Sequence, residues 1–268
     1  MVELVSDTSI ARPERNLLTN TLIRVMDSSV PVTSEGVFRA FNQHAEIVLS
    51  LPTSNHEHYI QNADARKLSL GAEHIDFVIT SPPYINVFNY HQNNRPAMEL
   101  LGWDLLQVAK SEFGSNRKHR GNRFLTVIQY CLDMHCALTE LRRTIKFSGR
   151  AIFVVGRESN VRGIAFQNGS LVSSLAESAG FKLEMRQERK FKNKFGELIY
   201  EDILHLVPNS FHITSAPSDI ALQHLREGLK QCQRAEIKAD MDAAIEVAPE
   251  VKPSPVYAPL PTAKLMVA

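Results

Sequence analysis

The stretch IDFVITSPPY, residues 75–84, joins a short apolar run directly to a Ser-Pro-Pro-Tyr string. Residues 75–80 are mostly β-branched or aromatic, a composition typical of a strand that is buried in a parallel sheet. Ligands of open α/β sheets bind at the carboxyl ends of the strands, and Ser81–Tyr84 would lie at such an end. The sequence therefore predicts a ligand site immediately after a buried strand.

The Ser81–Tyr84 string suits the recognition of an amine. Pro82 and Pro83 fix φ and lack an N–H, so the string is stiff and presents carbonyl groups without competing donors. A carbonyl beside the Ser81 hydroxyl would accept both hydrogens of an exocyclic amine on a nucleobase and leave the nitrogen lone pair free to attack a methyl group. Tyr84 would supply a face on which an extruded base stacks. Correct positioning of the amine beside a methyl donor would supply much of the lowering of the activation barrier, so the string favours methyl transfer. The alternative is that the string is only a rigid turn.

Hydrophobic periodicity predicts an α/β chain. Helices are expected at 16–26, 34–51, 124–145 and 169–179, and strands at 58–61, 75–80, 151–155, 181–189 and 198–207. This order favours a mostly parallel sheet with an antiparallel hairpin at its edge. An amphipathic helix over 218–247 and a Pro-rich, unfolded or extended tail follow. We therefore expect an N-terminal helical segment (1–51), a catalytic α/β part (52–210), and a C-terminal helix and tail (211–268).

Composition is that of an ordinary globular protein. The chain has 268 residues, of which 44% are hydrophobic, so it can bury a substantial core. Its N-terminus lacks the apolar segment of a secretory signal, and no apolar run is long enough to cross a bilayer. The three cysteines form no disulfide framework or metal pair, and the ten histidines have no metal-ligand spacing. We therefore expect a cytoplasmic protein with no membrane partner and no metal.

Positive charge is concentrated in two segments, although the net charge is only +1. Residues 110–123 hold five Lys or Arg against one Glu, and residues 182–194 hold six against two Glu. Basic patches on a neutral body favour nucleic acid over a membrane surface, while two solvated loops are the alternative. In the first segment we expect the following cations to clamp DNA phosphates: Arg117, Lys118, Arg120 and Arg123.

TSPPY after an apolar strand resembles the catalytic motif of the amino-group DNA methyltransferases, which methylate cytosine N4 or adenine N6 with S-adenosylmethionine. NADARKL, residues 62–68, is similar to the acidic turn that precedes this motif in the family, where the acid lies near the cofactor adenine. GRAIFVVGRES, residues 149–159, and the hairpin after it look like the second half of the methyltransferase sheet. The resemblance covers roughly residues 16–207, and TSPPY is its specific part.

This resemblance implies a fold, a cofactor and site residues. The fold would be α/β, with a Rossmann-like methyltransferase sheet, complete or incomplete, a terminal antiparallel hairpin and flanking helices. The cofactor would be S-adenosylmethionine, with Asp64 as a cofactor-binding residue; an Asp that binds backbone N–H groups of its own turn is the alternative. The catalytic residues would be Ser81, Pro82, Pro83 and Tyr84.

One element of the family is missing from the sequence. These enzymes hold the cofactor on a glycine-rich turn, where backbone N–H groups approach the ligand at a helix start. The 12 glycines of this chain include no Gly-x-Gly pair. The chain is then one subunit of a split enzyme whose second subunit carries the glycine-rich motif, or a truncated or decayed copy, or an enzyme with a divergent cofactor site.

The sequence thus predicts methyl transfer from S-adenosylmethionine to an exocyclic amine of DNA. Ser81 at the first motif position favours cytosine N4 as the acceptor, with adenine N6 as the alternative. An RNA amine methyltransferase and a non-catalytic DNA-binding subunit or remnant are the other hypotheses. Cofactor binding by the isolated chain distinguishes a complete enzyme from a remnant.

Overall fold

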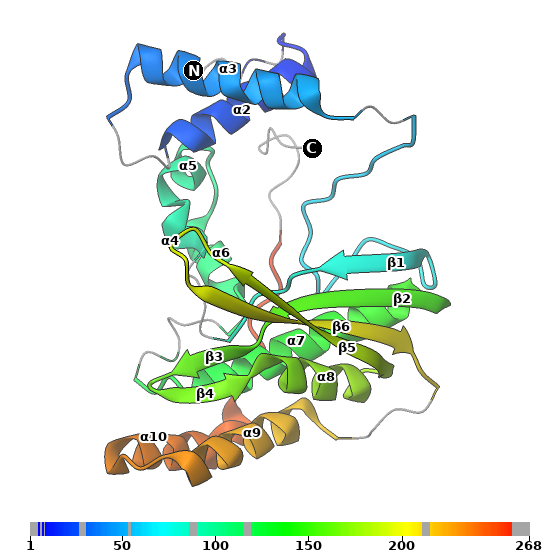
Figure 1. Cartoon of the computed structure of the whole chain (residues 1–268), viewed down its shortest axis with the longest axis vertical. Coiled ribbons are helices and arrows are strands. Elements are labelled where there is room, and N and C mark those ends of the chain that lie inside the picture. The colour runs from blue at the N-terminus through cyan, green and yellow to red at the C-terminus, as the bar shows by residue number, and fades with distance from the viewer. Residues whose placement is uncertain are drawn as a thin grey trace. The chain divides into compact units, whose positions relative to one another are not determined.

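The computed structural model describes residues 5, 7, 9–26, 31–52, 55–85, 90–114, 119, 121–210 and 215–258 (Figure 1). The chain divides into two compact units. The first holds Met1–Ala63, Phe88–Ala109 and Tyr257–Ala268, and the second holds Asp64–Val87 and Lys110–Val256. The expected boundaries lie at 51/52 and 210/211; in the structure the C-terminal helices contribute to the core of the second unit.

The second unit is built on a four-stranded mixed sheet, which confirms the predicted α/β class. Its strands lie in the order β1 (Ile75–Thr80), β2 (Ile145–Gly156), β6 (Leu198–Pro208) and β5 (Phe181–Lys192). β1 pairs with β2 in parallel, and β6 runs antiparallel to both β2 and β5. β1, β2 and β5 therefore run in one direction. Their carboxyl ends lie together at one end of the sheet, which we call the carboxyl edge.

Helices cover one face of this sheet. α8 (Asn168–Ser178) packs on β2, β5 and β6, and α7 (Leu125–Thr144) lies beside α8. The strands point alternate side chains toward this layer, so Phe153 of β2 and Leu204 of β6 are buried among residues of α7 and α8. The sheet from which the Ser81–Tyr84 string emerges therefore has a packed core on one face.

Three features of the second unit differ from the prediction. A mostly parallel sheet was expected, but only β1 and β2 pair in parallel, while β2 with β6 and β6 with β5 pair antiparallel. The expected helix over 218–247 is two helices, α9 (Pro217–Gln231) and α10 (Ala235–Glu246), because the chain turns extended at Cys232. A 3-10 turn, η1 (Ala248–Glu250), follows. A small hairpin of β3 (Glu158–Val161) and β4 (Ile164–Gln167) was not predicted, and Arg162 and Gly163 form its turn with φ of 54° and 90°.

The first unit is helical. α2 (Arg12–Met26) packs against α3 (Ser34–Ser50), and three short helices follow: α4 (Tyr90–Asn93), α5 (Arg95–Leu100) and α6 (Leu105–Ser111). Thr33 caps α3 by accepting a hydrogen bond from the Gly36 N–H, 3.1 Å away. The strand expected at 58–61 is absent: this segment is irregular, and its apolar side chains are exposed. Within the described part of the chain, no helix is both long and apolar enough to cross a bilayer.

Candidate functional site

The Ser81–Tyr84 string lies at the carboxyl edge of the sheet, as predicted. β1 ends with Thr80 paired to Phe153, and β2 continues for three more residues to Gly156. The ring of Tyr84 packs on Gly156, since a Cβ added there would lie 3.1 Å from Tyr84 Cε2. A glycine at the end of β2 thus makes room for the aromatic ring of the string.

Tyr130 of α7 fixes the string from the helix layer. Its hydroxyl donates a hydrogen bond to the carbonyl oxygen of Pro83, 2.9 Å away, and its side chain is only 1% exposed. Burial raises the pKa of the Tyr130 hydroxyl far above its usual value, so the group stays protonated and remains a donor. No sequence pattern indicates this contact, because residues 83 and 130 meet only in the folded sheet.

Two acceptors of the string remain available to a ligand. The Ser81 hydroxyl lies 3.3 Å from the Tyr84 hydroxyl, and either group can donate to the other. Ser81 is exposed, and none of the described residues donates to the Pro82 carbonyl. With Pro83 engaged by Tyr130, the Ser81 hydroxyl and the Pro82 carbonyl are acceptors that the described residues leave for a ligand.

An apolar groove adjoins the string. Its volume is about 520 Å³, and it runs along β1 and α7 to Ser81, Pro82 and Pro83. Phe77 and Ile79 of β1 line it and are 50% and 68% exposed. β1 is an edge strand, since no described strand pairs with its outer side. The groove therefore combines exposed apolar side chains with an open strand edge, which soluble proteins normally cover.

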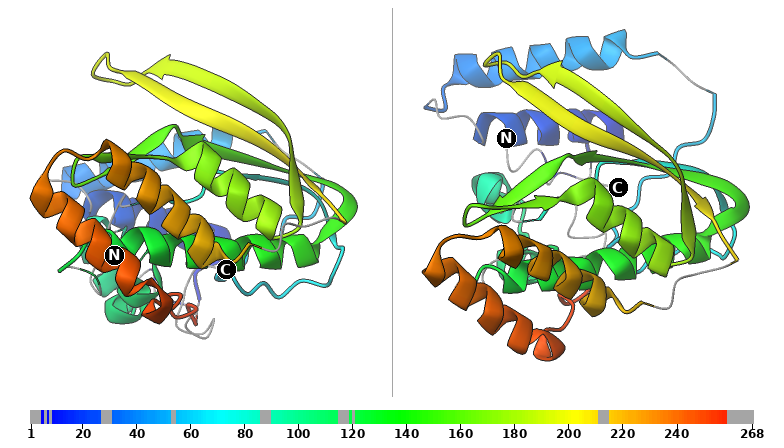
Figure 2. Two further views of the ribbon diagram at one scale, coloured as in Figure 1. Left: turned by 90° about the horizontal axis from the view of Figure 1, so that it is seen from below. Right: turned by 60° about the horizontal axis from the view of Figure 1, so that its bottom comes forward.

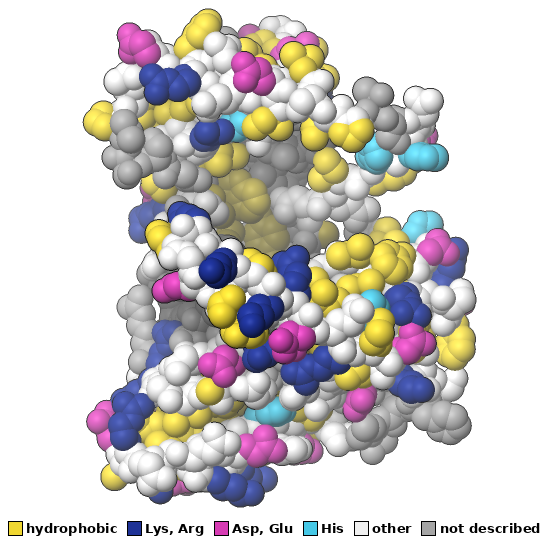
Figure 3. Space-filling model, viewed as in Figure 1, with side chains coloured by type: hydrophobic (Ala, Val, Ile, Leu, Met, Phe, Trp, Pro, Cys, Tyr) yellow, Lys and Arg dark blue, Asp and Glu magenta, His cyan; other side chains and the backbone are white. Residues whose placement is uncertain are grey.

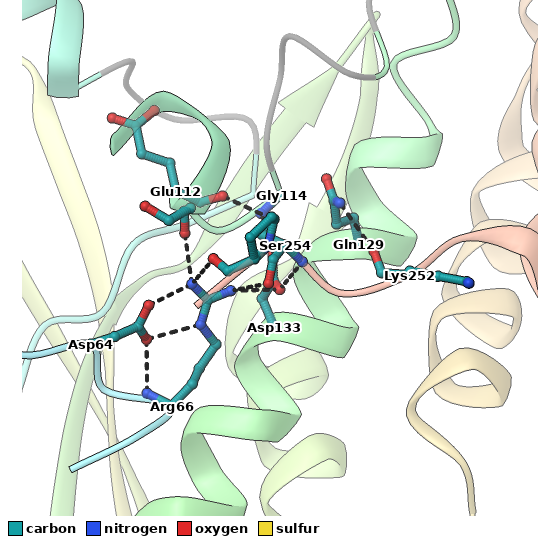
Figure 4. A network of polar contacts seen from close by, with 10 residues as sticks. Asp64, Arg66, Glu112, Gly114, Gln129, Asp133, Lys252 and Ser254 are labelled. Carbon is teal, nitrogen blue, oxygen red and sulfur yellow. Dashed lines mark hydrogen bonds and ion pairs between the residues drawn. The ribbon is translucent and has the colours of Figure 1, made fainter. Parts of the chain in front are cut away.

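Asp64 lies in a buried polar network instead of an open ligand site (Figure 4). Its carboxylate accepts hydrogen bonds from the Arg66 backbone N–H at 2.9 Å and from the Arg66 guanidinium at 2.6 and 2.9 Å. The Asp64 side chain is 4% exposed. The structure thus matches the alternative that Asp64 binds its own turn, and a direct contact with a cofactor would require this network to open.

The same network holds the C-terminal segment in the second unit. The Asp133 carboxylate accepts hydrogen bonds from Arg66 Nη1, from the N–H of Gly114, and from both the N–H and the hydroxyl of Ser254. Burial raises the pKa of Asp133, and these donors oppose the shift. Gln129 also donates to the Lys252 carbonyl (Figure 4). The segment expected to be an unfolded or extended tail is therefore extended and fastened to α7 over these residues.

The predicted phosphate clamp falls largely outside the described residues. Arg117, Lys118 and Arg120 are not among them. Arg123, just before α7, is described, and burial lowers its pKa. In the described part of the chain, no group of three His, Cys, Asp or Glu side chains is placed to hold a metal ion.

Comparisons with known proteins give only distant likenesses. No protein-family model matches the chain, and no curated protein matches its sequence. A solved structure from Thermus thermophilus, TTHA0409, named as a candidate DNA modification methylase, aligns over 65% of this chain and 59% of its own, at 17% identity and a TM-score of 0.33. The protein PH0226 of Pyrococcus horikoshii aligns over 66% and 68%, at 17% identity and a TM-score of 0.31.

The aligned part thus spans less than two thirds of the Thermus protein. Likenesses of this size carry no argument about function, and only the geometry of the site supports one.

Proposed function

We propose that this chain provides the amine-binding site of a DNA methyltransferase that transfers a methyl group from S-adenosylmethionine to an exocyclic amine, with cytosine N4 as the favoured acceptor. One observation carries the proposal. Ser81 is exposed and none of the described residues donates to the Pro82 carbonyl, and both groups lie on a stiff string at the carboxyl end of β1, beside the Tyr84 ring. This is the arrangement that an extruded, amine-bearing base requires.

The residues of this chain act on the acceptor base. The Ser81 hydroxyl oxygen and the Pro82 carbonyl oxygen accept hydrogen bonds from the two N–H groups of the amine. These bonds turn the nitrogen lone pair away from conjugation with the ring. Tyr84 stacks on the base and holds it in place. Tyr130 keeps the Pro83 carbonyl occupied and the string in one conformation. Preorganised acceptors of this kind lower the barrier because they need no rearrangement during the reaction.

We propose that the described residues form only part of a site for S-adenosylmethionine. The Asp64 carboxylate is already bound by Arg66, and the sequence has no Gly-x-Gly turn. We therefore propose that a second polypeptide carries the glycine-rich cofactor motif. The open edge of β1 and the exposed Phe77 and Ile79 support a partner, because one added strand would pair with the edge and cover both side chains.

DNA is the proposed substrate, and the basic segment around Arg117, Lys118, Arg120 and Arg123 is proposed to contact its phosphates. Phosphate contacts position a duplex without reading its sequence. Replacing Arg117, Lys118 and Arg120 with Gln should weaken binding to all DNA sequences alike and flatten the dependence of affinity on salt. An unchanged salt dependence would show that these charges are only solvated.

Labelled methyl transfer tests the proposed function. The tagged chain is purified from the organism that encodes it, so that any partner is retained, and is incubated with labelled S-adenosylmethionine and unmethylated DNA. We expect label in N4-methylcytosine that is lost with Ser81→Ala and kept with the control Ser148→Ala, an exposed serine at the other end of β2. Label in N6-methyladenine would change the acceptor, and label only in RNA would replace DNA as the substrate. Label that Ser81→Ala does not reduce would refute the site.

A further inference from the structure

The β5–β6 hairpin extends beyond the rest of the sheet. The pairing of β2 with β6 ends at Gly156 and Glu201. β5 and β6 continue past that point through three more pairs: Lys190 with Tyr200, Phe191 with Ile199, and Lys192 with Leu198. Both views of Figure 2 show this two-stranded arm projecting from the second unit. We call residues 189–200 the hairpin arm.

The hairpin arm projects from the edge of the sheet that carries the Ser81–Tyr84 string. β5 runs parallel to β1 and β2, because β6 is antiparallel to both β2 and β5. The carboxyl end of β5 therefore lies on the same side as the carboxyl end of β1. A polymer bound along this edge would reach both the string and the hairpin arm.

The tip of the hairpin arm has a defined conformation. The Asn193 side-chain oxygen accepts hydrogen bonds from the N–H groups of Phe195 and Glu197, at 2.9 and 3.0 Å. Gly196 takes the positive φ of 83° that closes the turn. Phe195 is 76% exposed at this tip. A large aromatic side chain held in solvent by an ordered turn is suited to a contact with another molecule.

The hairpin arm carries positive charge that the described residues do not neutralise. Arg189 pairs with Glu201, and Glu188 at its base pairs with Arg157. Lys190, Lys192 and Lys194 have no carboxylate partner among the described residues. All residues of the tip are described. The one acidic group among them is Glu197, whose carboxylate forms no ion pair with a described residue and accepts a hydrogen bond from Asn193. Figure 3 shows the Lys and Arg side chains gathered along the hairpin.

Aromatic rings alternate with these cations. Lys190 lies 5.6 Å from the centre of the Tyr200 ring, Arg189 4.9 Å from that of Phe191, and Lys194 5.0 Å from that of Phe195. Surfaces that combine cations with exposed rings bind nucleic acids, because the cations contact phosphates and the rings contact bases and sugars. An acidic peptide or an anionic membrane would use the charges but has no need of this alternation.

We propose that the hairpin arm is a DNA-binding element, in which Lys190, Lys192 and Lys194 contact backbone phosphates and Phe195 packs against a base or sugar. The choice of DNA rests on the proposed function. Because the arm and the string share one edge of the sheet, the arm would hold the duplex that presents its base to Ser81 and Pro82. It contacts the polymer and takes no part in the chemistry.

Fluorescence anisotropy with a labelled DNA duplex tests this element on the full chain, without cofactor. We expect Lys190→Gln, Lys192→Gln and Lys194→Gln together to reduce the slope of log affinity against log salt by about 0.9 per lost phosphate contact, about 2.7 in total. The control removes three exposed lysines elsewhere, Lys230→Gln, Lys238→Gln and Lys252→Gln, and should keep the wild-type slope. Phe195→Ala should weaken binding and leave the slope unchanged, because the ring carries no charge.

The outcomes separate this proposal from the proposed function. Equal slopes for the two triple variants would refute the hairpin arm, whatever methyl transfer is found. If the slope falls only for the arm variant and the chain transfers no methyl group, DNA binding by the hairpin arm is supported and the proposed methyl transfer is refuted. Binding of anionic vesicles in preference to duplex DNA, with the same dependence on the three lysines, would overturn DNA as the ligand. Arginine at the three positions should restore the wild-type slope, because arginine carries the same charge as lysine.

Discussion

The hydroxyl of Tyr130 donates a hydrogen bond to the carbonyl oxygen of Pro83 at 2.9 Å, which joins the interior of α7 to the Ser-Pro-Pro-Tyr string. This bond occupies one of the carbonyls of the string, while none of the described residues donates to the Pro82 carbonyl. It also fixes the string at its second proline, next to the Tyr84 ring that packs on Gly156. The helix layer thus occupies one acceptor of the string and holds it at Pro83.

Tyr130→Phe should lower the free energy of unfolding by about 1 kcal/mol or more, because the Pro83 carbonyl then loses its donor. Urea titration measures the change. Tyr59→Phe is the control, since that hydroxyl is bonded only at the exposed surface, to Glu57; it should stay within about 0.5 kcal/mol of the wild type. Equal stabilities for all three proteins would show that the Tyr130 bond does not hold the string.

Tyr84→Ala should reduce methyl transfer because the base loses its stacking partner, a contact worth about 1–3 kcal/mol on comparable platforms. Tyr84→Phe keeps the ring and should retain most of the activity. Rates are measured with the tagged, partner-containing preparation under single-turnover conditions. A Tyr84→Ala variant that transfers methyl groups at the wild-type rate would remove Tyr84 from the site.

Arg66→Met should destabilise the second unit by about 3–5 kcal/mol, since Asp64 and Asp133 would then be buried without their cation. Chemical unfolding measures this loss. Arg95→Met is the matched control, because Arg95 and Glu99 form an exposed ion pair that contributes at most about 1 kcal/mol. A similar, small effect of both substitutions would mean that the network around Arg66 is not a major source of stability.

Local sequence patterns predicted the main strands of the sheet but not the contacts that hold the site. The run of residues 75–80 and the hairpin of β5 and β6 follow from composition and alternation, which depend on near neighbours in the chain. The β3–β4 hairpin escaped prediction because its strands have four residues each and its turn is Arg162-Gly163 instead of a typical Asn-Gly pair. The break at Cys232 has no proline or glycine to mark it.

The buried network was beyond prediction for a different reason. Arg66 bonds to Asp133, 67 positions away, and to the Ser254 carbonyl, 188 positions away. No local pattern links such residues, so the role of Asp64 could be inferred only from the residues of its own turn. That turn was compatible with a cofactor contact and with a structural role, and in the structure its carboxylate is bound by Arg66.

The isolated chain should bind S-adenosylmethionine weakly or not at all, because the glycine-rich turn is absent from its sequence and Asp64 is occupied. A partial pocket leaves polar groups of the ligand unpaired, and their desolvation offsets the contacts that remain. Isothermal titration of the purified 268-residue chain measures this directly. Saturable binding with a Kd of about 1 μM, or about −8 kcal/mol, would place a cofactor site within this chain and make a second subunit unnecessary.

The central claim is that Ser81–Tyr84 positions an amine of DNA for methylation, and the methylated bases of the genome test it most directly. The gene is deleted in the organism that encodes it and restored as wild type, as Ser81→Ala or as Ser148→Ala, and N4-methylcytosine and N6-methyladenine are mapped by sequence context. We expect one methylated motif to disappear on deletion, to return with the wild type and Ser148→Ala, and to stay absent with Ser81→Ala. A methylation map that the deletion leaves unchanged, or that Ser81→Ala restores in full, would contradict the account.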